Sequence, residues 1–406
     1  MEKKRTGQVL SAVNFMILMA ALGASDSLRG IFAPAFQSHF SLNAMQLSVI
    51  IMVSYVGNLV FLCLGGRALD KYNRKKAAMG ILLLWIGALL LYLLTDSYVA
   101  LLVGMFFAMG TSTLLNTTVN ILTPMIFATS PGMMVNIFFF VQGIGTSGSQ
   151  NLAGRTAGSY EAFKLVNVIL VVMGVISLIL FSRMEFSQDG TLDGASEDTS
   201  ENASAAGGQV PYREVFRQKG FLILVLIFGF YFIAEHGIMN WLVSYGTGAL
   251  KLPAAKAAMY LSGFYGGITV GRLIFSPVVS KAGAFKSIRW FGGIGTALFV
   301  LGILLGSQGL ALLSLSGLAV SIIYPTMVYM VHYIYPPRML GAGLGAVISV
   351  ATLFDIGFNV VFGRMVDVAG YGVSFLVIPL SMVLFYGCYL IFSKICKERE
   401  DESRND

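Results

Sequence analysis

The stretch Gly66-Arg67-Ala68-Leu69-Asp70-Lys71-Tyr72-Asn73-Arg74-Lys75-Lys76 places a dense group of charges between two long apolar runs. Gly66 lets two backbones approach closely, and Asn73 tolerates the backbone of a tight turn. The clustered cations favour the cytoplasmic side of a membrane. Together these properties predict a short cytoplasmic loop between two membrane helices, from which we derive the topology of the whole chain.

This loop resembles the signature loop of the major facilitator superfamily, in which a Gly, an acid and several basic residues latch the two halves of the protein in one state. The resemblance implies a conformational latch at Gly66, Asp70, Lys71 and Arg74. The alternative is an ordinary basic loop of some other membrane protein. The internal repeat described below favours the latch.

The composition is too apolar for a soluble protein. Of the 406 residues, 56% are hydrophobic and 12% are charged, whereas about a quarter of the residues in a soluble domain are charged. The formal net charge of +7 does not indicate a nucleic-acid partner, because most Lys and Arg residues lie in segments that we place in the cytoplasm. This asymmetry follows the positive-inside rule and predicts contact with anionic lipid.

Apolar runs of about 20 residues, each long enough to cross the hydrocarbon core, recur twelve times. The first run resembles a secretory signal, but its removal would leave an odd number of spans, so we interpret it as a membrane helix. Both termini are then cytoplasmic. The predicted spans are residues 10–31, 46–66, 77–95, 99–125, 134–154, 163–182, 221–245, 256–280, 290–306, 309–334, 341–363 and 372–393.

One long polar segment divides the chain, and its acidic, Ser-rich and Gly-rich sequence cannot bury a core. We therefore predict an all-α membrane protein with twelve transmembrane helices in two pseudo-symmetric six-helix bundles. Its parts are an N-terminal bundle (1–182), a disordered cytoplasmic linker (183–220), a C-terminal bundle (221–394) and a cytoplasmic tail (395–406).

The two halves repeat each other. Tyr55 and Gly57 of the second span recur as Tyr265 and Gly267 of the eighth, at an offset of 210 residues, and basic residues follow both spans. Parallel repeats of this kind are typical of the superfamily, whose solute site lies near the membrane midplane between the halves.

Ionisable side chains inside spans are costly, so each is a candidate for function. Asp26 and Arg29 of the first span are three residues apart and can meet on one helix face. In the functional interpretation, Asp26 takes a proton while Arg29 holds an acceptor oxygen of the solute. A self-neutralising structural pair is the alternative.

The second half has its own ionisable residues. His236 falls opposite Asp26 at the repeat offset, so we expect both to face a central cavity. Glu235 is the preferred proton-coupling acid, because burial favours the protonated form and no cation adjoins it in sequence. His236 and Asp355 are further coupling candidates. A packing role for Glu235 remains open, as does a choice between ion pairing and solute contact for Arg272.

The other solute-binding candidates are uncharged. Amides donate and accept hydrogen bonds, and an aromatic ring offers a flat apolar face, which together suit a hydroxylated solute. The same side chains also serve as contacts between membrane helices, which is the alternative. These candidates are Asn116, Asn120, Gln142, Asn240, Trp241 and Tyr324.

The chain is also similar to one branch of the superfamily, the fucose and related sugar:proton symporters. The similarity lies in residues 234–245, in Gly271 with Arg272, and in residues 321–326. It implies a sugar as the solute and a proton as the coupling ion. Gly30 and Asn116 stand where the branch carries its coupling acids, so this chain departs from the branch there.

We therefore expect a secondary active transporter that moves a small polar solute, a sugar or related metabolite, by alternating access with proton coupling. One alternative is transport of a small carboxylate, which Arg29 and Arg272 favour. Another is export of amphipathic compounds, which a cavity dominated by Met residues and by Phe138, Phe139 and Phe140 would favour.

Other functional classes fit the sequence poorly. A receptor that uses the same fold is disfavoured because the sequence shows no signalling domain. An enzyme is disfavoured because the spans contain no nucleophile with a base, no metal-ligand cluster and no phosphate loop. The three cysteines are scattered, which predicts neither disulfides nor a metal site. We expect no cofactor, no nucleic acid, and a monomer in a bacterial plasma membrane with a solute, protons and lipid as partners.

Overall fold

The computed structural model describes residues 2–71, 74–127, 129, 131–184, 212–336 and 339–405. Within these ranges, the side chains of residues 2–6, 63–71, 74, 212, 280 and 397–405 lie outside the description. The predicted latch residues Gly66, Asp70, Lys71 and Arg74 belong to this set, so the latch stays a prediction.

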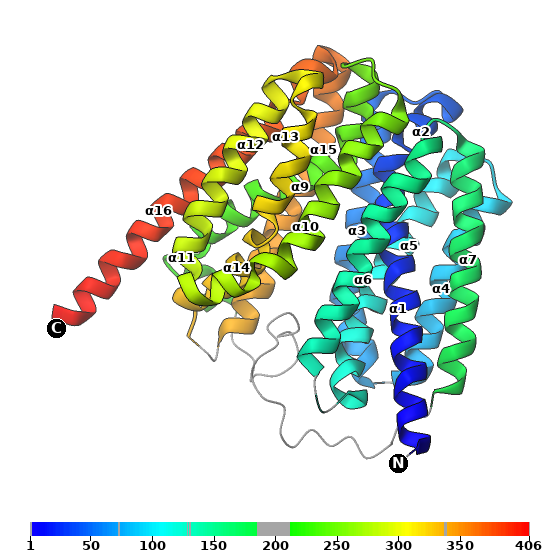
Figure 1. Ribbon diagram of the computed structural model, residues 1–406, viewed down its shortest axis with the longest axis horizontal. Helices are drawn as coiled ribbons and strands as arrows, with labels where there is room; N and C mark the ends of the chain where they lie inside the picture. Colours follow the sequence, from blue (N-terminus) through cyan, green and yellow to red (C-terminus); the bar gives the residue numbers. More distant parts are fainter. Residues whose placement is uncertain are drawn as a thin grey trace. The chain divides into compact units, whose positions relative to one another are not determined.

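Helices make up nearly all of the described chain, and no strand occurs in those residues (Figure 1). Ten of its helical segments are long and apolar enough to cross a membrane. The predicted fifth and eighth spans form the further helices α6 (Pro131–Leu152) and α10 (Ala254–Ala282), in which small, polar and basic residues dilute the apolar ones. The predicted all-α membrane fold is therefore confirmed.

The chain forms two compact units. The first comprises Met1–Thr199 with Ala254–Met259, and the second comprises Ser200–Pro253 with Tyr260–Asp406. Besides α6, the helices of the first unit are α1 (Glu2–Ile31), α2 (Ala33–Phe40), α3 (Ala44–Lys71), α4 (Arg74–Leu94), α5 (Tyr98–Ile126), the 3-10 helix η1 (Ala153–Thr156) and α7 (Tyr160–Arg183).

The second unit contains most of α10 and a matching series of long helices. They are interrupted by short 3-10 and π segments. In order they are α8 (Tyr212–Arg217), α9 (Phe221–Gly248), α11 (Ala284–Ser287), η2 (Ile288–Gly292), α12 (Gly293–Leu304), η3 (Gly306–Gln308), α13 (Leu310–Val320), α14 (Ile323–Met330), η4 (Val331–Tyr333), α15 (Leu340–Ser374) and α16 (Val377–Asn405).

The repeated glycines make equivalent helix contacts in the two units. A Cβ on Gly57 of α3 would lie 2.2 Å from the carbonyl oxygen of Phe106 in α5. In the second unit, a Cβ on Gly267 of α10 would lie 2.9 Å from the amide nitrogen of Leu318 in α13. Small residues of this kind allow helix backbones to touch, which drives association where no hydrophobic effect operates. The repeat in the sequence is thus a repeat of backbone contacts.

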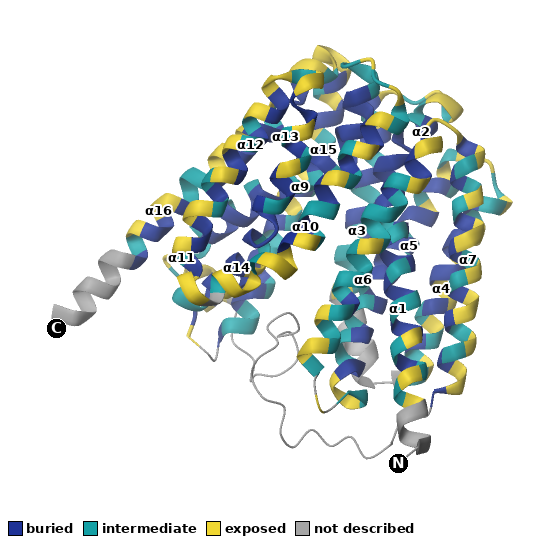
Figure 2. Cartoon of the chain, viewed as in Figure 1, coloured by how far each residue is buried: buried dark blue, intermediate teal, exposed yellow. Residues whose placement is uncertain are grey.

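One face of α7 is exposed (Figure 2), and large apolar side chains form a stripe along it. Its exposed residues recur at helical spacing, as expected for a side that faces lipid chains. The stripe consists of Leu165, Ile169, Val172, Ile176 and Ile179.

The predicted tenth span is broken into α13 and α14 at Ser321 and Ile322. Pro325 explains the break, because proline has no N–H and its ring clashes with the carbonyl four residues earlier, which belongs to Ser321. The freed carbonyl oxygen accepts a long hydrogen bond from Nε of Arg272 in α10, at 3.4 Å. A side chain therefore replaces the backbone donor that the proline removes.

Lys75 of the charged loop binds the end of another helix. Its Nζ donates to the carbonyl oxygens of Ser182 and Met184, at 2.8 and 2.7 Å, where α7 ends. A cation at a helix C-terminus satisfies carbonyl groups that the helix leaves open. This loop residue thus joins the start of α4 to the end of α7.

The predicted linker ends in an ordered segment. Residues 185–211 lie outside the described chain, but α8 follows them, and Val215 of α8 is fully buried. The Val215 carbonyl accepts a hydrogen bond from the hydroxyl of Tyr335 at 3.0 Å, and burial raises the pKa of Tyr335 to about 12. Residues 212–220 therefore belong to the folded second unit and not to a disordered linker.

The glycine contacts predict the effect of adding one methyl group. Gly57→Ala should destabilise the protein by about 1 to 3 kcal/mol, because the methyl group overlaps the Phe106 backbone. Gly87→Ala in α4 is the matched control, since a Cβ there meets nothing within 4 Å. The unfolding temperatures of the two variants, monitored by the loss of the monodisperse peak in size-exclusion chromatography after heating, check this prediction. Equal temperatures would contradict the α3–α5 contact.

Candidate functional site

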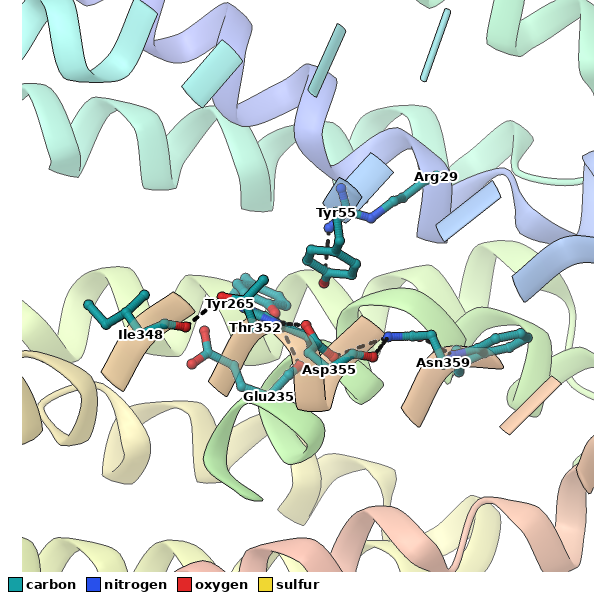
Figure 3. A network of polar contacts seen from close by, with 10 residues as sticks. Arg29, Tyr55, Glu235, Tyr265, Ile348, Thr352, Asp355 and Asn359 are labelled. Carbon is teal, nitrogen blue, oxygen red and sulfur yellow. Dashed lines mark hydrogen bonds and ion pairs between the residues drawn. The ribbon is translucent and has the colours of Figure 1, made fainter. Parts of the chain in front are cut away.

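In the first unit, Arg29 is a buried cation within a membrane span. Only 4% of the residue is exposed. Its Nη2 donates to the Tyr55 hydroxyl at 3.2 Å, and its guanidinium carbon lies 4.8 Å from the centre of the Tyr55 ring (Figure 3). Its Nη1 contacts the sulfur of Met109 at 3.1 Å. The phenol and the ring stabilise a charge that hydrocarbon alone would not tolerate.

Asp26 lies on the same helix as Arg29. Its carboxylate oxygen Oδ1 is buried and has no hydrogen-bond partner among the described residues. Ser112 of α5 and Arg29 are its polar neighbours. An open acceptor in this position is costly unless a proton, an ion or a solute donor reaches it. Direct pairing of Asp26 with Arg29 on one helix face stays a prediction from the sequence.

Three amide side chains of the first unit form a row. Nδ2 of Asn116 in α5 donates to Oε1 of Gln142 in α6 at 3.3 Å, and Nδ2 of Asn120 donates to Oδ1 of Asn116 at 3.5 Å. All three side chains are half-buried. The structure thus brings these three predicted residues together, and Oδ1 of Asn120 is a buried acceptor without a hydrogen-bond partner among the described residues.

In the second unit, a hydrogen-bond chain joins α9 to α15. Nε1 of Trp241 donates to Oδ1 of Asn359 at 2.8 Å. Nδ2 of Asn359 donates to Oδ1 of Asp355 at 3.1 Å, and Oδ2 of Asp355 pairs with Nδ1 of His236 at 2.6 Å. Figure 3 shows Asp355 and Asn359 side by side on α15. Each link fixes the orientation of the next, so the chain holds Asp355 in one position.

Asp355 has the partner that its sequence context does not show. The residue is 1% exposed, and His236 lies 119 positions away in the chain. Sequence reasoning also missed Asn359, although its spacing of four from Asp355 places both on one helix face. Asn359 further anchors itself by donating to the Asp355 carbonyl at 2.8 Å.

Trp241 and Asn240 have no exposed surface. Sequence analysis placed both around a solute, but here the Trp241 ring packs on Phe362 with ring centres 4.7 Å apart. Tyr324 is half-buried and lies beside the rings of Phe228 and Phe232. Of these three predicted residues, only Tyr324 offers accessible surface in this conformation.

Glu235 and Arg272 lie close to Tyr231 in the second unit. Both, together with Tyr265, are electrostatic neighbours of the Tyr231 hydroxyl. The Tyr265 hydroxyl donates to the backbone carbonyl of Glu235 at 3.2 Å. Because Arg272 also binds the open Ser321 carbonyl, the structure gives Arg272 a role in holding α10 to the broken tenth span.

The described side chains offer no group of three His, Cys, Asp or Glu residues that could hold a metal ion. Phe138 is fully buried against Phe15, with ring centres 5.5 Å apart. This ring therefore belongs to the packed core of the first unit, and it does not contribute to the aromatic cavity that export of amphipathic compounds would require.

The hydrogen-bond chain from Trp241 to His236 predicts the effect of removing the Trp241 N–H group. Trp241→Phe should destabilise the protein by about 1 to 2 kcal/mol, because it leaves the Asn359 oxygen without its donor in an apolar setting. Trp290→Phe is the matched control, since Trp290 is 69% exposed. Unfolding temperatures of both variants check this, and an equal loss in both would contradict a structural role for the Trp241 N–H.

Two curated proteins are similar to this chain in sequence. One is the hexuronate transporter of Bacillus subtilis (strain 168), 23% identical over 311 residues, which cover 74% of this chain and 72% of the relative. The other is the cis,cis-muconate transport protein of Acinetobacter baylyi (strain ATCC 33305 / BD413 / ADP1), 22% identical over 238 residues, which cover 58% of this chain and 56% of the relative.

Two solved structures share the fold. The nucleoside transporter NupG aligns with a TM-score of 0.75 at 11% identity, over 95% of this chain and 99% of that chain. The E. coli fucose:proton symporter FucP aligns with a TM-score of 0.61 at 19% identity, over the same shares.

The family comparison agrees with the helix arrangement and with the repeated glycine contacts. The family model described as Major Facilitator Superfamily matches residues 9–356, which is most of the 406-residue chain. The chain belongs to the major facilitator superfamily and has its fold of two six-helix bundles, so it is a membrane transporter and not an enzyme.

Proposed function

We propose that this protein is a secondary active transporter of a small hydroxylated carboxylate, of which a sugar acid is the type. The observation that carries the proposal is Arg29, a guanidinium buried within α1 and adjacent to Asp26. An ionisable residue within a membrane span is a candidate for function, and a guanidinium there can recognise an anion.

The geometry of Arg29 suits a carboxylate better than a neutral sugar. A guanidinium presents a planar fork of donors that matches the two oxygens of a carboxylate. Two of these donors contact a phenol oxygen and a thioether sulfur, which are weaker acceptors than a carboxylate. A carboxylate solute would therefore form the stronger bond.

The amide row of the same unit suits the hydroxyl groups of such a solute. Asn116, Asn120 and Gln142 are half-buried and carry both donors and acceptors. A sugar hydroxyl also donates and accepts, so it could donate to the unpartnered Oδ1 of Asn120 and join the row.

The names of both curated relatives support a carboxylate. A hexuronate combines hydroxyl groups with a carboxylate, and muconate carries two carboxylates. A hexuronate is both a sugar derivative and a carboxylate, so it belongs to both of the solute classes that the sequence analysis gave as alternatives. The likeness to FucP and NupG supports the fold and does not favour a neutral sugar.

We further propose that transport is coupled to protons and that Asp26 takes one of them. Its open carboxylate oxygen beside Arg29 supports this role. Asp26 loses its charge on protonation and then no longer competes with the solute for Arg29. The charge pattern of the sequence supports two further proposals, cytoplasmic termini and the latch of the charged loop. We also propose a bacterial plasma membrane, as the short loops suggest, and a monomer in contact with lipid.

Uptake into proteoliposomes tests the proposed solute class. Radiolabelled glucuronate should enter faster than glucose, and Arg29→Gln should reduce its uptake at least about tenfold, as expected when a charge-assisted hydrogen bond is lost. Arg29→Lys should recover part of the rate, because Lys keeps the charge but not the fork. Arg183→Gln, at the exposed end of α7, is the control and should transport like the wild type.

Two results would contradict this proposal. Glucose uptake that exceeds glucuronate uptake and is insensitive to Arg29→Gln would point to a neutral sugar. Expulsion of an amphipathic dye, without uptake of either solute, would point to an exporter.

A further inference from the structure

We propose that the pair His236–Asp355 carries a transported proton in the second unit, and that Glu235 is a packing residue there. This inference rests on the proposed function and names its coupling group. It differs from the expectation drawn from the sequence, which favoured Glu235.

The pair has one closed end and one accessible end. Asp355 has a side chain 1% exposed, while the side chain of His236 is 27% exposed, and their nearest atoms are 2.6 Å apart. A buried carboxylate is costly unless a positive charge or a proton compensates it. The accessible imidazole can take that proton from water and share it with the buried acid.

The charge of the pair changes with the proton. With neutral imidazole the pair carries one negative charge on Asp355, and with imidazolium the pair is neutral. Closing the site to water is much less costly for the neutral form, because desolvation penalises the isolated charge. A conformational change that excludes water therefore favours the proton-loaded pair, which is what coupling requires.

Asn359 and Trp241 determine which oxygen of Asp355 meets His236. The Trp241 N–H fixes the amide oxygen of Asn359, so the amide NH₂ faces Oδ1 of Asp355. Oδ2 then binds Nδ1 of His236. Asp355 is thus a positioning residue for His236, and the imidazole is the accessible member of the pair.

The described contacts around His236 come from α10, α14, α15 and α16. α15 contributes Asp355, and α10 contributes Tyr265, which binds the Glu235 backbone. α14 contributes Tyr324, which meets Phe232, the ring that stacks on His236. α16 contributes the apolar Ile378 against Gly237. Among these described contacts, Asp355 is the acid that binds the His236 ring.

Glu235 has a different environment from its neighbour in sequence. Its side chain points away from Asp355 in Figure 3. It lies near Tyr231 and the cation of Arg272, which also binds the Ser321 carbonyl. These neighbours belong to the contacts that hold α9 and α10 to the broken tenth span, so Glu235 suits helix packing better than proton transfer.

Transport in two modes separates coupling from folding. Proteoliposomes would be loaded with glucuronate for exchange, or given a proton gradient for accumulation. His236→Gln and Asp355→Asn should lose proton-driven accumulation at least about tenfold, while exchange should continue at a rate comparable to that of the wild type. Glu235→Gln should retain both modes, and His332→Gln is the matched histidine control. Accumulation that survives in His236→Gln, or that is lost only in Glu235→Gln, would overturn the proposal.

Histidine spectroscopy tests the pair without any solute. The chain contains three histidines, so labelled His236 can be assigned by the signal that disappears in His236→Gln. This signal should titrate between about pH 5 and pH 8, and its midpoint should differ by about one pH unit or more in Asp355→Asn but not in Glu235→Gln. A His236 signal that is indifferent to pH, or to Asp355→Asn, would overturn the inference.

The two experiments distinguish the failures. If glucuronate does not move but the histidine signal behaves as expected, the solute class is wrong and the proton pair stands. If glucuronate is exchanged normally but the signal does not respond to Asp355→Asn, the transporter stands and the pair does not.

Discussion

Polar groups inside a membrane span have to find partners within the protein, because hydrocarbon supplies none. The described spans meet this constraint in several ways. Several threonine hydroxyls of α5 donate hydrogen bonds to backbone carbonyls one turn earlier in the same helix, namely those of Thr111, Thr118 and Thr123. Arg272 reaches a carbonyl freed by Pro325, and the Trp241 N–H donates to the Asn359 amide, which in turn donates to Asp355. The candidate sites lie where this satisfaction is incomplete or depends on a proton.

The two units pack their helices through equivalent glycine contacts, but their corresponding polar residues have different hydrogen-bond partners. Gly57 and Gly267 bring equivalent helix pairs into backbone contact. Tyr55 and Tyr265 also correspond, but the first binds a guanidinium and the second binds a backbone carbonyl. The shared positions therefore preserve the scaffold, whereas the groups that those tyrosines bind distinguish the chemistry of the two units.

The sequence was sufficient for the fold because hydropathy, loop charge and the repeat are local or periodic signals. Side-chain pairing across helices is neither, which is why Asp355 was expected to need a distant partner but His236 was not identified as that partner. Trp241 illustrates the same limit: its ring could line a cavity or close a buried chain, and only its contacts decide. The break at Ser321 was readable from Pro325, while the order of α8 depends on Tyr335, more than a hundred residues later.

Pro325 and Arg272 both act on the backbone carbonyl of Ser321. As long as the proline is present, the oxygen of Ser321 lacks its backbone donor, and a long cationic side chain on α10 is the group that reaches it. Gly271 allows α10 to approach Ser321 closely enough for this hydrogen bond, since a Cβ on Gly271 would lie 2.5 Å from the Ser321 hydroxyl oxygen. In a relative without this proline, the backbone N–H at position 325 could donate to the Ser321 carbonyl again. Arg272 and Gly271 would then no longer be needed for that contact. We therefore expect these positions to covary among relatives of this chain.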